Sequence, residues 1–176
     1  MNLPIKTLED IRKLEPCYDP GKYAPEDWEG TALDVLKAEQ VPVHDRLWVV
    51  CHEGWIDDKT LRLFAVSCAR QALALVDNPD PRSVNAIDVS ERYANGKATK
   101  EELAAARVTA WNAACAAAWS AAGVTAWNAA GAAAWAAAGA AAWAAACAAA
   151  RAVAGAVAGA AAWDAQVKQL IKMLEE

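Results

Sequence analysis

The chain has 176 residues, a formal net charge of -5, nine tryptophans and a single phenylalanine. This length corresponds to one domain, or to one domain with an extension, and it is sufficient to bury a core. The acidic balance argues against DNA, RNA or an anionic membrane surface as the main partner, because these partners require clustered lysine and arginine.

The first predicted element is a short helix over residues 7–15. Thr7 is a suitable N-cap, acidic residues fill the first turn, and Pro16 ends the helix. The segment 17–30 is rich in proline, glycine and aromatic residues, which is typical of an ordered loop laid over a core. Three aromatic residues are expected to anchor this loop: Tyr18, Tyr23 and Trp28.

Three further helices are predicted before residue 77. They cover residues 31–40, 44–54 and 57–76, although a strand over 47–50 is an alternative within the second. Asp58 is expected to cap the third helix. Apolar residues recur in that helix at spacings of three and four, which predicts one buried stripe. The stripe consists of Leu61, Phe64, Ala65, Cys68, Ala72, Leu75 and Val76.

Two helices are predicted before the alanine-rich region: one covers residues 81–96, and the next begins at Thr99. Pro81 suits a first helical position, and Gly96 suits a left-handed helix end. Thr99 and Glu102 have the spacing of a capping box, in which each residue hydrogen-bonds to the backbone of the other. This junction is expected to begin an alanine-rich helix that leads to a charged tail at the C-terminus.

The alanine-rich region contains an internal repeat. It has a sixteen-residue period, seen in VTAWNAACAAAWSAAG, VTAWNAAGAAAWAAAG and AAAWAAACAAARAVAG, and residues 108–150 include no charged side chain. Within this period, large and small residues alternate every four positions. The tryptophans of the region are Trp111, Trp119, Trp127, Trp135, Trp143 and Trp163.

The spacing of these tryptophans predicts that they wind around a straight helix. Each eight-residue step shifts a side chain by about 80° around the axis. A helix that is apolar on all sides must be buried, so the helix is surrounded, supercoils right-handedly, or folds back at glycine. One continuous helix from Thr99 would run about 115 Å, more than the preceding residues can cover. We therefore expect the region to mediate homo-oligomerisation.

Two other roles for the tryptophan region are kept as alternatives. Indole rings stack on nucleobases, and Arg107 and Arg151 could contact a phosphate, so an oligomer that sequesters a small nucleotide is conceivable. The uncharged stretch also exceeds the roughly 20 residues that span a bilayer. A membrane association is less favoured, because alanine and glycine drive insertion weakly and the tryptophans form no interfacial belts.

Catalytic, metal and redox signatures are weak. A nucleophile and a base are close in sequence only at Cys51 and His52, and His44 is next to Asp45. Adjacent residues of a helix point in different directions, so adjacency alone does not form a catalytic dyad. The acidic pair at 57–58 suits a helix start better than a metal site. Five widely spaced cysteines without a CxxC pair favour a reducing, cytoplasmic setting. We expect no enzyme activity, no metal and no cofactor.

Several segments resemble a family of bacterial and phage immunity proteins with an Imm-5-like domain. They are WVV (48–50), LRLFAVSCARQ (61–71), the block 81–107 and the Ala/Trp array that follows. Immunity proteins neutralise a toxin by binding it, so the resemblance implies a non-enzymatic binder. Members of the family repeat arginine and aspartate within the array. This chain keeps only Arg151 and Asp164 there, which puts a role of charged array residues in doubt.

Together these observations predict an all-α protein. We expect an N-terminal helical domain over residues 1–98, followed by an Ala/Trp-rich repeat helix or helical hairpin over 99–176 that packs in an oligomer. The leading function is a cytoplasmic protein-binding factor of immunity or phage anti-defence type, whose partner is a toxin or defence protein. The alternatives are the nucleotide-sequestering oligomer and the membrane-associated helical protein.

Overall fold

The computed structural model describes residues 2–74, 78–119 and 160–176, and these are mostly helical. The prediction of a predominantly helical protein is confirmed at this level. The helices are α1 (Leu8–Arg12), the 3-10 helix η1 (Pro20–Lys22), α2 (Ala32–Lys37), α3 (Val43–Val50), α4 (Asp58–Leu73), α5 (Pro81–Ala94), α6 (Lys100–Trp119) and α9 (Ala160–Glu175).

One short strand pair departs from the all-α prediction. β1 (Lys6–Thr7) pairs antiparallel with β2 (Glu29–Gly30), and the Leu8 amide donates to the Trp28 carbonyl at 3.1 Å. Strands of two residues carry no alternating pattern, so no sequence periodicity predicts them. The pair closes the 17–30 loop by joining its end to the segment that begins α1.

The predicted capping of α1 is confirmed, and its predicted end is wrong. The Thr7 hydroxyl accepts from the Asp10 amide at 3.2 Å, and Asp10 accepts from the Thr7 amide at 3.0 Å. The helix ends at Arg12 instead of Glu15. Pro16 disfavours the right-handed helical conformation in the residue before it, and Glu15 leaves that conformation with a φ of 54°.

The start of α4 corrects a second prediction. Asp57, and not Asp58, is the N-cap, since its carboxylate accepts from the Thr60 amide at 3.0 Å. Asp57 and Asp58 suit the N-cap position equally by residue type, and α4 begins so that Asp57 occupies it. The strand alternative over 47–50 is also wrong, because α3 continues through these residues.

The junction between α5 and α6 follows the sequence prediction. Gly96 has a φ of 69°, the left-handed conformation that ends a helix. The Thr99 amide donates to the Glu102 carboxylate at 2.7 Å, and the Glu102 amide donates to the Thr99 hydroxyl at 3.2 Å. The capping box is therefore present, and it turns the chain so that α6 packs along α5.

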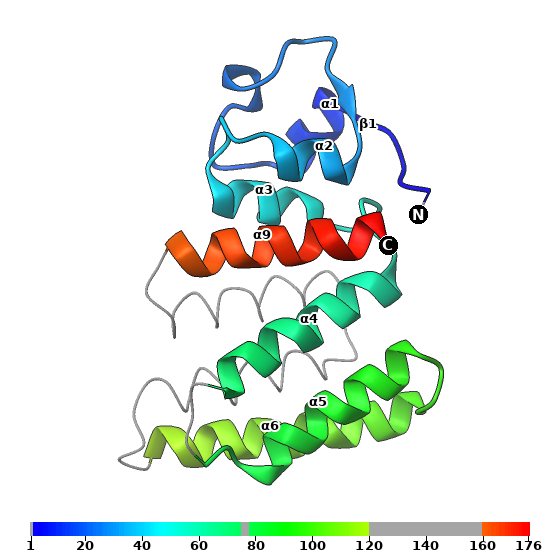
Figure 1. Ribbon diagram of the computed structural model, residues 1–176, viewed down its shortest axis with the longest axis vertical. Helices are drawn as coiled ribbons and strands as arrows, with labels where there is room; N and C mark the ends of the chain where they lie inside the picture. Colours follow the sequence, from blue (N-terminus) through cyan, green and yellow to red (C-terminus); the bar gives the residue numbers. More distant parts are fainter. Residues whose placement is uncertain (1, 75–77, 120–159) are drawn as a thin grey trace.

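The helices stack in layers along the long axis of the molecule (Figure 1). α2 packs on α3, α3 on α9, α9 on α4, α4 on α5 and α5 on α6. The C-terminal helix α9 thus lies between helices of the N-terminal part. α6 and α9 are therefore not parts of one straight helix from Thr99, which would place the C-terminus about 115 Å from Thr99.

α9 also corrects the expectation of a charged tail. Its side chains Val167, Leu170 and Leu174 are buried at spacings of three and four, and Lys37 of α2 pairs with Glu175 at 2.7 Å. The charges of the segment lie on the exposed face of an amphipathic helix. The last ten residues are therefore part of the core.

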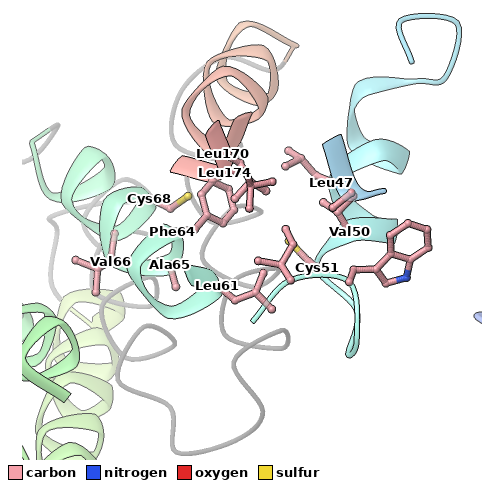
Figure 2. Packing of buried hydrophobic residues seen from close by; sticks show 14 of the residues in the cluster. Leu47, Val50, Cys51, Leu61, Phe64, Ala65, Val66, Cys68, Leu170 and Leu174 are labelled. Carbon is pink, nitrogen blue, oxygen red and sulfur yellow. The ribbon is translucent and has the colours of Figure 1, made fainter. Parts of the chain in front are cut away.

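The core gathers around Phe64 on α4. Figure 2 shows its ring near Leu170 and Leu174 of α9, while Leu47 and Val50 of α3 lie beyond these two leucines. The predicted stripe of α4 is confirmed from Leu61 to Ala72, and its members at 75 and 76 lie outside the described residues.

Candidate functional site

The histidine near Cys51 has a structural role. His52 Nδ1 lies 2.6 Å from the Trp48 carbonyl oxygen one turn earlier, and its ring centroid lies 4.3 Å from that of the Trp48 indole. A carbonyl oxygen only accepts, so Nδ1 carries the proton. Cys51 is fully buried in the core. The geometry holds the imidazole against α3.

The other candidate acids and bases have similarly local partners. His44 Nε2 lies 3.3 Å from the Asp45 carboxylate, and the His44 side chain is largely exposed. Asp57 caps α4. In the part of the chain that the structure describes, no group of three or more His, Cys, Asp or Glu side chains could hold a metal ion.

The cysteines whose side chains the structure describes differ in burial. Cys17 is exposed, and Cys51 and Cys68 are buried. Burial raises the pKa of the Cys68 thiol far above its ordinary value, because a thiolate loses its hydration in an apolar core. Cys68 is therefore a small core residue, as its place on the stripe predicts.

The structure describes the ends of the predicted tryptophan site. Trp111 and Trp119 belong to α6, and the structure describes only the backbone of these two residues. Trp163 of α9 is half-buried and packs against the core, while Arg107 is exposed on α6. The remaining predicted site residues lie outside the described segments: Trp127, Trp135, Trp143 and Arg151.

A pocket that the sequence analysis did not predict lies between the 17–30 loop and the first three α-helices. The empty space in and above it is about 420 Å³, open solvent included. Its floor is apolar and buried, and it is formed by Leu8, Ile11, Val35 and Val49. These side chains come from three helices, α1, α2 and α3.

The walls and mouth of the pocket are aromatic and partly open. The Tyr18 and Tyr23 rings pack edge to face with centroids 5.8 Å apart, and Trp28 also lines the pocket. Gln40 at the mouth donates to the Tyr23 carbonyl at 3.3 Å and so ties the loop to the segment after α2. Of the three predicted loop anchors, Trp28 packs against the core, whereas the two tyrosines form a wall of the pocket.

The interior of the pocket is neutral, whereas the 17–30 loop beside it is predominantly acidic. Burial, reinforced by the charge of Asp45, raises the pKa of Tyr18 to about 12, so its phenol is neutral at physiological pH. No charged side chain is among the lining residues. Outside the pocket, the 17–30 loop carries four carboxylates and one lysine. Arg12 of α1 forms two hydrogen bonds of 2.7 Å with one of these, Glu26.

Comparison of the chain with protein-family models, curated proteins and solved structures gave no match. The resemblance to immunity proteins therefore depends on the sequence segments alone. Across residues 2–74, 78–119 and 160–176, no helix has the length and apolar character needed to cross a membrane.

The composition of the 17–30 loop contained a partial signal for the pocket. Aromatic residues separated by proline and glycine predicted a loop packed over a core. Whether such a loop seals the core or leaves a space depends on side-chain volumes contributed by three helices. A local sequence pattern does not contain the combined volume of side chains from three helices.

Proposed function

We propose that the protein is a non-enzymatic protein-binding factor of immunity or anti-defence type, which self-associates through its Ala/Trp array. The observation that carries this proposal is the open apolar pocket in an acidic helical unit. Protein interfaces obtain most of their binding energy from a few anchor side chains seated in such pockets. A neutral cavity with charge outside it suits an anchor side chain and a surrounding polar rim.

The distribution of charge supports a protein partner with basic character. Residues 1–98 carry 17 acidic and 12 basic side chains, whereas residues 99–176 carry five of each. The whole excess of negative charge therefore belongs to the part of the chain that contains the pocket. Such a field accelerates encounter with a positively charged protein and disfavours acidic ones.

The array supports self-association by a separate argument. Residues 108–150 have no charged side chain. Monomeric proteins seldom expose large contiguous apolar patches. α6 and α9, which lead into and out of the segment 120–159, both pack on the other helices. The folded unit can thus present a partner-binding surface while the array brings copies of the chain together.

The test is co-expression with the protein encoded by the neighbouring gene. We expect a complex that survives size-exclusion chromatography, and relief of any growth arrest that the neighbouring protein causes. A neighbour that forms no complex and is not neutralised would contradict the proposal. Quenching of tryptophan fluorescence by cyclic or ADP-ribose-type nucleotides, in place of complex formation, would support the nucleotide-sequestering alternative.

A further inference from the structure

We infer that the pocket formed by α1, α2, α3 and the 17–30 loop receives one apolar side chain of a partner protein, and that basic residues flank this side chain on the partner. The inference rests on the proposed function, because it names the chemistry of the partner that the protein-binding factor recognises. Three properties of the pocket support it: its size, its neutral lining and its acidic rim.

The size of the pocket suits a single side chain. Its 420 Å³ include the open mouth, so the enclosed part is smaller. A small-molecule ligand needs a pocket that buries most of its surface. A leucine or phenylalanine side chain needs less space, because its backbone stays at the surface. The half-buried state of Tyr18, Tyr23 and Trp28 shows that the aromatic wall reaches this surface.

The lining determines which part of the partner enters. No charged side chain lines the pocket, and the floor residues Leu8, Ile11, Val35 and Val49 are buried. A charged group in this space would lose its hydration without an ion-pair partner, at a large energetic cost. Apolar side chains gain free energy by the same transfer. The charged groups of the partner must therefore remain at the mouth.

The residues that flank the pocket lining along the chain carry a net negative charge. Asp19, Asp27 and Glu39 are exposed and directly adjoin lining residues in the sequence, whereas Lys22 is an exposed basic residue that does so. Glu26 is paired with Arg12 and contributes less net charge. Lysine or arginine side chains beside the anchor would meet these carboxylates across the rim. This attraction affects mainly the rate of association, and salt weakens it.

The probe is a capped nine-residue peptide with one central leucine between two pairs of lysines. Two control peptides replace the leucine with serine or the lysines with glutamate. Binding is measured by NMR from the indole signal of Trp28, which the Trp28→Phe variant identifies. We expect the leucine–lysine peptide to bind, and each control peptide to bind about tenfold more weakly or worse.

Two protein variants with matched controls locate the binding. Ala24→Phe places a ring in the pocket and should weaken peptide binding at least about tenfold, whereas Val84→Phe, on exposed α5 at the other end of the molecule, should not (Figure 1). Glu39→Lys should weaken binding severalfold at low salt, with a smaller effect at high salt. Asp164→Lys, an exposed charge reversal on α9, should have less effect.

Failure of this inference can be separated from failure of the proposed function. If the chain binds its neighbouring gene product and Ala24→Phe leaves that complex unchanged, the pocket inference is wrong and the function stands. If the peptide binds at the pocket while no protein complex forms, the proposed function is wrong. Equal binding of the three peptides would overturn the inference of a basic partner. A dimer that Ala24→Phe dissociates would also overturn it, because a second copy of the chain would then fill the pocket.

Discussion

Glycine at position 30 is required by the space beside it. A Cβ atom there would lie 2.6 Å from Cζ2 of the Trp28 indole, closer than real contacts allow. Gly30→Ala must therefore displace the indole that forms a wall of the pocket, and we expect it to destabilise the fold by about 1–3 kcal/mol. Urea denaturation measures this change.

Gly21→Ala is the matched control for Gly30→Ala. Its nearest neighbour would be the Asp19 carboxylate at 3.2 Å, the end of a flexible side chain. We expect a change of about 0.5 kcal/mol or less. Equal effects of the two substitutions would show that the contact between Gly30 and Trp28 is not tight.

The Asp10 carboxylate links stability to acidic pH. Hydrogen bonds from the Thr7 amide, the Thr7 hydroxyl and Lys13 lower its pKa from 3.8 to about 2. A pKa that is lower in the folded state contributes stability that is complete above pH 3.8 and is lost as the pH falls through 2. Asp10→Asn should remove this part of the acid dependence of the urea midpoint.

Glu9→Gln controls for the loss of one negative charge in the same turn of α1. Glu9 is exposed, whereas Asp10 is the residue that completes the capping box with Thr7. If both variants change the profile between pH 4 and pH 2 equally, the capping box is not the origin of the acid dependence that Asp10 contributes.

At the scale of elements, α9 determines whether the two ends of the chain unfold together. Leu170 is fully buried against α3 and α4, so Leu170→Ala should destabilise the protein by about 2–5 kcal/mol. Lys168→Ala, on the exposed face, should change stability by about 0.5 kcal/mol or less. Circular dichroism during thermal unfolding measures both. A Leu170→Ala protein as stable as the Lys168→Ala protein would show that α9 does not belong to the cooperative unit.

The residues that begin and end helices were the most predictable part of the fold. The Thr7 cap, the Gly96 helix end and the capping box of Thr99 and Glu102 were all identified from sequence and are present. Each depends on residues no more than three positions apart, so the chemistry is local. The prediction of Asp58 as the N-cap of α4 was wrong, because the choice between Asp57 and Asp58 depends on a one-residue shift of backbone geometry.

The elements that were missed depend on distant contacts. The strand pair joins residues 6–7 to 29–30, and neither segment has a pattern of its own. α9 did have the spacing of an amphipathic helix in Val167, Leu170 and Leu174, but its charged residues concealed that signal. Its partners are α2, α3 and α4, which end at least 87 positions earlier in the chain. The pocket was missed for the same reason, since its floor combines three helices.

At the scale of the whole molecule, the stacking of helices separates two surfaces. The pocket lies at the end formed by α1 and α2, and the α5–α6 pair lies at the opposite end (Figure 1). α6 contains the described beginning of the Ala/Trp array, and Val108 on it is 59 % exposed. Self-association that begins at this end would leave the pocket accessible to a partner, so both parts of the proposed function are compatible.

This arrangement predicts an oligomer whose formation depends on the array. The 176-residue chain has a mass of 18.6 kDa, and we expect light scattering after size-exclusion chromatography to give a multiple of it. Replacing Trp127 and Trp135, which lie outside the described residues, with arginine should reduce the mass, because charged groups in a dry interface lack hydration. Val84→Arg, on the exposed face of α5, is the control. A mass of 18.6 kDa at all concentrations, or an oligomer that the arginines leave intact, would rule out assembly through the tryptophans.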